Sequence, residues 1–117
     1  MEFKDIDISL RKFSERHDLI NHALESCRNA IKSCLEENPD EGYPLDETEL
    51  RFDKQELVFN HHFYNTPYIK TQIGLYQLVK GIASEDDSDK YGYYILDTDE
   101  KGNHFDDSLV YENKNNS

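Results

Sequence analysis

A single apolar stripe through residues 14–37 constrains the fold of this chain more than any other feature of its sequence. The segment contains no proline or glycine, and its apolar residues recur at spacings of three and four. That spacing places them on one face of an α-helix. The stripe consists of Phe13, His17, Ile20, Leu24, Cys27, Ile31 and Cys34, and it is widened by Leu19, Ala23, Ala30 and Leu35. The pattern therefore predicts a core-facing helix with Ser14 as its N-cap and Pro39 just beyond its end.

Residues 1–13 form an amphipathic lead-in to this helix. A cap at Asp7 or Ser9 would allow either one helix from about Leu10 or two helices joined near Phe13. We expect the nearly continuous helix. The 24 residues from Ser14 onward would span about 36 Å at 1.5 Å per residue. Such a helix needs other elements of the chain to cover its apolar stripe.

From residue 49 the apolar period changes from 3.6 to two, which is typical of β-strands. We expect strands over residues 49–52, 57–64, 68–79, 91–97 and 105–111. We expect connections at residues 53–56 (a hairpin), 65–67 (a turn), 81–90 (a loop) and 99–103 (a hairpin). Gly102 suits a position with positive φ in the last hairpin, and Gly74 predicts a bulge or a close backbone approach.

These elements predict one α+β domain, with a long N-terminal helix packed on a four- to five-stranded antiparallel β-sheet (a meander). Within 1–117 we expect a helical part over 1–38, the sheet over 49–112 and a flexible tail over 113–117. The 14 aromatic residues argue against a disordered chain. No apolar run approaches the roughly 18 residues of a membrane span, and the acidic N-terminus is unlike a signal peptide. We therefore expect a cytoplasmic protein.

The two cysteines predict core packing and not a disulfide. Cys27 and Cys34 are seven residues apart on the predicted helix, about 10 Å by helical rise, which exceeds the reach of a disulfide. Both lie on the apolar stripe, so we expect reduced core residues.

Two residue patterns resemble metal-binding sites, but neither meets the requirements of such a site. Residues 97–103 begin like a calcium loop, but Lys101 and Ser108 occupy the fifth and twelfth positions, where the pattern requires oxygen ligands and a glutamate. His61 and His62 are neighbours on a predicted strand and point to opposite faces. We expect no catalytic residues, no metal and no cofactor. The alternative is a small metal-dependent hydrolase that uses the carboxylates of Asp97, Asp99, Asp106 and Asp107.

The distribution of charge is the more informative signal for function. The chain carries 25 acidic and 13 basic side chains, a net charge of −12, and residues 36–56 and 85–107 each contribute −7. Such a surface repels nucleic acid and attracts basic partners, although solubility alone would also account for it. Tyrosines beside carboxylates favour a binding patch. The predicted partner-binding residues are Glu85, Asp86, Asp87, Asp89, Tyr91, Tyr93, Asp99, Glu100, Asp106 and Asp107, and the segment around Asp46, Glu47 and Glu49 is the next candidate.

A small acidic domain with a long N-terminal helix and a sheet ending in GYYILDTDEKGNHFDDSLVYE is similar to the immunity proteins of bacterial toxin systems. These systems include contact-dependent growth inhibition and related polymorphic toxins. The resemblance implies binding and neutralisation of one cognate basic toxin domain, often a nuclease, by blocking its active site. The net negative charge predicts no direct contact with nucleic acid or membrane. No functional residue is carried over from the family by position. The alternative is a nucleic-acid mimic that inhibits another DNA-binding protein.

Overall fold

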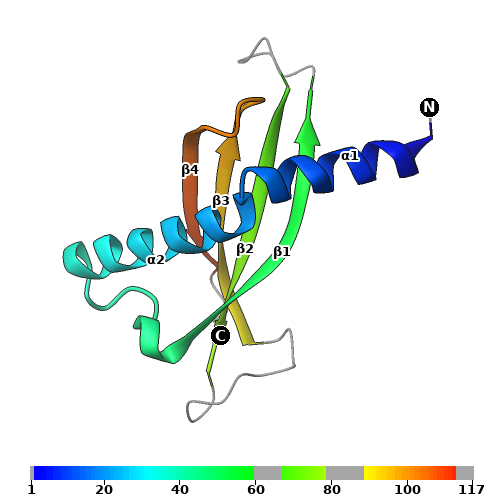
Figure 1. Ribbon diagram of the computed structural model, residues 1–117. Helices are drawn as coiled ribbons and strands as arrows, with labels where there is room; N and C mark the ends of the chain where they lie inside the picture. Colours follow the sequence, from blue (N-terminus) through cyan, green and yellow to red (C-terminus); the bar gives the residue numbers. More distant parts are fainter. Residues whose placement is uncertain (1, 60–66, 79–88, 113–117) are drawn as a thin grey trace.

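A four-stranded antiparallel sheet carries two helices on one of its faces (Figure 1). The computed structural model describes residues 2–59, 67–78 and 89–112. The elements in chain order are α1 (Phe3–Arg16), α2 (Leu19–Glu37), the 3-10 turn η1 (Leu45–Glu47), β1 (Thr48–Val58), β2 (Tyr68–Gln77), β3 (Lys90–Thr98) and β4 (His104–Tyr111). The strands pair in chain order, which confirms the α+β class and the antiparallel meander. Neither described helix has the length and apolar composition needed to cross a membrane.

The helical part is divided into two helices, so the prediction of one nearly continuous helix is wrong. Between Arg16 and Leu19 the chain passes through Asp18, which has the left-handed conformation φ 52°, ψ 42°. Aspartate is one of the few residues other than glycine that tolerates this conformation. Ser14, the predicted N-cap, is instead buried within α1, where its hydroxyl accepts a hydrogen bond of 2.9 Å from the side-chain amide of Gln55.

Strand β1 is continuous over 11 residues, so the hairpin predicted at residues 53–56 is wrong. The register with β2 shifts between Phe52 and Lys54, which makes Asp53 a bulge residue. A bulge inserts one unpaired residue and then lets the ladder continue. The predicted strand residues 60–64, most of the turn at 65–67, most of the loop at 81–90 and the tail 113–117 lie outside the described residues.

The core lies between α2 and the middle of the sheet. Helix α2 buries four residues spaced by four, namely Leu19, Ala23, Cys27 and Ile31. The facing sheet residues of the core are Ile73, Leu75, Tyr91, Tyr94 and Leu96. Both cysteines are free, as predicted, and Cys27 is buried whereas Cys34 is half-buried. Burial raises the pKa of the Cys27 thiol to about 12, so this group remains neutral in the core.

Candidate binding surfaces

The fold divides the predicted acidic patch of residues 85–107 between two ends of the sheet. Asp89 directly precedes β3 and Asp99 directly follows it. At about 3.3 Å per residue the nine-residue strand separates them by roughly 30 Å. Glu85, Asp86 and Asp87 lie outside the described residues. The described residues of this patch therefore do not form one continuous surface.

Tyr91, one of the predicted partner-binding residues, lies in the core and is not exposed. Its hydroxyl shares a 2.7 Å hydrogen bond with Thr48, and its ring stacks on Tyr111. The register of β2 with β3 shifts at this point, so Tyr91 is an extra residue turned toward the helices. Strict alternation would place Tyr91 and Tyr93 on the same face. The bulge separates them and leaves Tyr93 half-buried on the helix-free face.

Asp99 and Glu100 occupy the turn between β3 and β4, which confirms the hairpin predicted at residues 99–103. The carboxylate of Asp99 accepts hydrogen bonds from the backbone N–H groups of Lys101 (2.9 Å) and Asn103 (3.0 Å). Gly102 has φ +84°, as predicted for this position. Asp99 therefore stabilises the turn.

The carboxylates proposed for a hydrolase do not converge on one point. Asp97 is buried and lies opposite Asp106 in the β-ladder. Asp107 points to the helix side, where its carboxylate accepts a 2.7 Å hydrogen bond from the Tyr94 hydroxyl. Within residues 2–59, 67–78 and 89–112, no group of three or more His, Cys, Asp or Glu side chains is arranged to hold a metal ion.

The opposite end of the sheet gathers carboxylates from both acidic segments. Here β1 begins, β2 ends, β3 begins and β4 ends, because the four strands are antiparallel neighbours. We name this surface the acidic end. It consists of Glu36, Glu37, Asp40, Glu41, Asp46, Glu47, Glu49, Asp89 and Glu112. Residues 36–49 contain seven of these carboxylates and no lysine or arginine.

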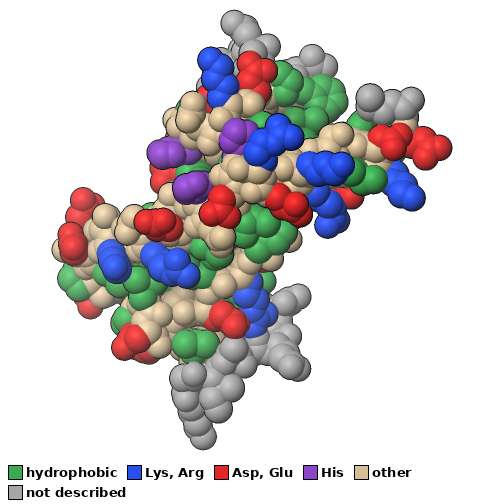
Figure 2. All heavy atoms as spheres, in the orientation of Figure 1, with side chains coloured by type: hydrophobic (Ala, Val, Ile, Leu, Met, Phe, Trp, Pro, Cys, Tyr) green, Lys and Arg blue, Asp and Glu red, His purple; other side chains and the backbone are tan. Residues whose placement is uncertain are grey.

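The C-terminus of α2 makes the acidic end more negative. The last turn of α2 contains Glu36 and Glu37 and no basic residue. A helix C-terminus carries a partial negative charge, which cations stabilise and carboxylates do not. Figure 2 shows acidic side chains clustered around the free end of this helix. The carboxylates of Glu36 and Glu37 and the partial charge of the helix C-terminus are all negative and repel one another. A cationic group bound here would reduce that repulsion.

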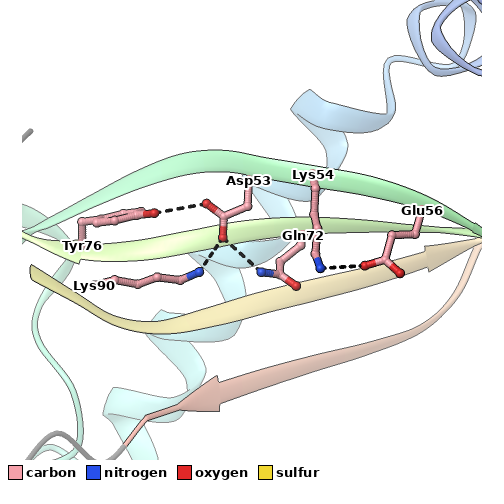
Figure 3. Close-up of polar contacts among 6 residues, drawn as sticks. All are labelled: Asp53, Lys54, Glu56, Gln72, Tyr76 and Lys90. Atoms are coloured by element: carbon pink, nitrogen blue, oxygen red, sulfur yellow. Dashed lines mark hydrogen bonds and ion pairs between the residues drawn. The ribbon is translucent and has the colours of Figure 1, made fainter. Parts of the chain in front are cut away.

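A polar cluster on the helix-free face joins three strands beside the acidic end (Figure 3). The carboxylate of Asp53 accepts hydrogen bonds from Lys90 (2.8 Å), Gln72 (3.1 Å) and Tyr76 (3.2 Å). Burial alone would lower the pKa of Lys90, but the hydrogen bond and charge of Asp53 raise it above its ordinary value overall. Asp53 thus holds Lys90 as a cation within the sheet, and the charge of Glu112 also favours the charged form.

Gly74 makes room for this cluster. A Cβ atom at Gly74 would lie 2.7 Å from a carboxylate oxygen of Asp53, which is too close for any side chain. The position of Gly74 within a strand predicts a bulge or a close backbone approach. The structure shows the close approach of a carboxylate, with the bulge in the neighbouring strand at Asp53.

Comparison of the chain with protein-family models, curated protein sequences and solved structures finds no match.

Raising the pH above about 10 is expected to destabilise the protein, because its buried tyrosines resist ionisation. Burial and, secondarily, the hydrogen bond to Asp107 raise the pKa of Tyr94, and burial raises that of Tyr91. In the unfolded chain these groups lose a proton near pH 10, whereas in the folded protein they do not. Their contribution to stability is therefore complete below that pH and is lost as the pH rises further.

Urea unfolding between about pH 8 and pH 12 measures this effect. The change Tyr94→Phe removes one titrating group, so we expect the fall in stability to become shallower by about 1.4 kcal/mol per pH unit above pH 10. A slope equal to that of the unmodified protein would contradict the assignment to Tyr94.

Proposed function

We propose that this protein is a stoichiometric inhibitor that binds and neutralises a basic protein, a toxin domain of the nuclease class, through its acidic end. The observation that carries the proposal is that residues 36–49 bring seven carboxylates to the end of the sheet where Asp89 and Glu112 also lie. Two basic groups beside it are engaged, since Arg51 pairs with Glu49 and Lys90 pairs with Asp53. Among the described residues, the other carboxylates of the acidic end form no ion pair with a lysine or arginine.

The mechanism follows from the chemistry of a nuclease active site, which binds substrate phosphates with basic groups. Carboxylates of the acidic end would occupy the positions of those phosphates and exclude the substrate. The net charge of −12 would also steer a basic protein toward this protein and accelerate association. The same field disfavours direct binding to nucleic acid.

Tyr43 is the aromatic residue best placed to anchor such a partner. It lies in the connection between α2 and η1, is half-buried, and contacts Tyr91 edge-to-face at 4.8 Å between ring centroids. Partly buried tyrosines held by a rigid neighbour are typical interface anchors. We therefore assign the role of aromatic anchor to Tyr43, since Tyr91 is buried.

Two charge-reversed variants test the location of the site. We expect Asp46→Lys combined with Glu47→Lys to weaken 1:1 binding to the protein encoded beside this gene by about tenfold or more, and to reduce protection of cells. The matched control, Glu100→Lys combined with Asp106→Lys, changes the net charge equally at the other end of the sheet. Both proteins are titrated calorimetrically against the partner. Loss of binding in the control alone would place the site at the β3–β4 hairpin.

A further inference from the structure

Helix α1 overhangs the edge of the sheet. Its C-terminal part packs on β1, because the hydroxyl of Ser14 accepts a 2.9 Å hydrogen bond from Gln55. Phe3, Asp7 and Leu10 precede Ser14 at spacings of four and three, so they share its face of the helix. Phe3 lies about 16 Å from Ser14 along the helix, which is roughly three strand spacings. The N-terminal turns of α1 therefore extend past β1 (Figure 1), where Phe3 is 88% exposed.

An apolar groove lies between α1 and the sheet. Two adjoining cavities of about 330 Å³ and 300 Å³ share Leu10, Leu57 and Ile69 in their walls. Phe52 also lines the larger cavity. The two β1 residues of the groove remain partly open to solvent, since Phe52 is 44% exposed and Leu57 is 38% exposed. Large apolar side chains exposed along a groove are typical of a surface that binds another protein.

The outer edge of β1 is available for one more strand. β1 lies at one side of the sheet, so within residues 2–59, 67–78 and 89–112 its outer edge has no paired strand. Beyond the bulge at Asp53, its register with β2 is uninterrupted from Lys54 to Val58. Unpaired backbone N–H and C=O groups along such an edge are a template for a further strand. A strand added here would lie under the overhanging turns of α1, at the mouth of the groove.

The groove is acidic as well as apolar, which selects the chemistry of its occupant. Five acidic and two basic side chains line the two cavities, a net charge of −3. They are Asp7, Glu15, Glu56, Asp99, Glu100, Arg11 and Lys54. Two ion pairs balance four of these charges, and among the described residues Glu15, Asp99 and Glu100 form no ion pair with a lysine or arginine. A second copy of this chain would bring the same excess of carboxylates, whereas a basic segment would complement it.

We propose that the groove between α1 and β1 binds an extended basic segment of another protein, which pairs as an added strand with the outer edge of β1. Successive side chains of a strand point to opposite faces. Apolar side chains on one face of the added strand would therefore lie against Phe3, Phe52 and Leu57, and its lysines or arginines would complement the unpaired carboxylates. Backbone hydrogen bonds supply affinity in this mode of recognition, and the side chains supply specificity. The groove and the acidic end lie at opposite ends of β1, so this proposal does not rest on the proposed inhibitor function.

A labelled peptide of about ten residues that alternates lysine with valine is the probe, and fluorescence anisotropy with the full chain at about 150 mM salt measures its binding. We expect a 1:1 complex that Leu57→Lys, and separately Phe52→Lys, weakens by about tenfold or more. Phe105→Lys is the matched control, because Phe105 is 41% exposed and lies on β4. We expect this control to change the affinity by less than about twofold.

A second pair of variants separates the groove from the acidic end, which also attracts a basic peptide. We expect Glu15→Lys combined with Glu100→Lys to weaken binding by about fivefold or more, because two unpaired carboxylates of the groove are reversed. Asp46→Lys combined with Glu47→Lys changes the net charge equally at the acidic end, and we expect less than about a twofold effect. Loss of binding in the acidic-end variant alone would place the peptide there and overturn the proposal.

Hydrogen exchange of the unmodified protein, followed by NMR, tests strand pairing without any substitution. We expect the outward-facing amides of residues 54–58 to exchange about tenfold or more slowly when the peptide is bound, because they then donate hydrogen bonds to it. Exchange rates in β1 that the peptide does not change would overturn the proposal. Absence of 1:1 binding up to about 500 μM protein, or equal affinity in the Leu57→Lys and Phe105→Lys variants, would also overturn it.

Discussion

Replacement of Ile31 by alanine is expected to lower the free energy of unfolding by about 2–5 kcal/mol. Ile31 is fully buried and belongs to the core cluster that joins α2 to β2 and β3. Truncation removes apolar surface from the core and leaves a cavity between a helix and a sheet, two rigid elements that cannot readily close it. Urea unfolding monitored by circular dichroism gives the difference.

The control for this change is Ile95→Ala. Ile95 has the same side chain but is half-buried on the helix-free face of β3. We expect its truncation to cost about 1 kcal/mol or less, since less apolar surface is lost. A cost within about 0.5 kcal/mol for Ile31→Ala would mean that α2 presents a different face to the sheet.

Replacement of Asp53 by alanine is expected to cost about 2–4 kcal/mol. Asp53 is the common acceptor for groups on β2 and β3, and the side chains of Asp53 and Lys90 are only 15% and 25% exposed. Without the carboxylate, the Lys90 ammonium group remains partly buried next to Gln72 and Tyr76 and loses its ion-pair partner. Leaving a buried charge unpaired costs more than an ordinary lost hydrogen bond.

The matched control is Glu56→Ala, on the same strand and the same face (Figure 3). Glu56 pairs with Lys54, but the two side chains are 48% and 55% exposed. Exposed ion pairs contribute little, so this change should cost about 0.5 kcal/mol or less. If the two changes prove equally mild in urea unfolding, the Asp53 cluster does not hold the three strands together.

The 3.6-residue period of apolar residues predicted the buried face of α2 in part. Cys27 and Ile31 lie on the predicted stripe, whereas the buried Leu19 and Ala23 were predicted only to flank it. The break at Asp18 was not predictable. One residue in a left-handed conformation redirects the chain while the apolar spacing continues through it. The aspartate at position 18 does not by itself predict a break in the helix, since aspartates are also common on helix surfaces.

The two bulges account for the errors in the strands and in the predicted patch. The run of residues 53–56 is polar enough for a turn, but Asp53 is held inside the sheet by residues distant in sequence. The bulge at Tyr91 likewise turns that side chain inward. Alternation alone cannot locate an inserted residue.

The acidic end was only partly predictable. Its carboxylates are visible as two charged segments, but which parts of them meet depends on the strand order. The sequence favoured residues 85–107 as one surface. The meander instead brings Asp89 to the end where β1 begins, and carries Asp99 and Glu100 to the other end of the sheet.

The most direct test of the proposed function is the rate at which this protein associates with its proposed basic partner, for which the product of the neighbouring gene is the candidate, measured by stopped flow at about 50 mM and about 500 mM salt. If the acidic end binds that partner, the rate should fall by about tenfold or more as salt rises. Reversal of Asp46 and Glu47 should slow association at low salt and flatten its salt dependence, whereas reversal of Glu100 and Asp106 should change both far less. A rate that is insensitive to salt, or equal in the unmodified and Asp46/Glu47-reversed proteins, would contradict the proposal.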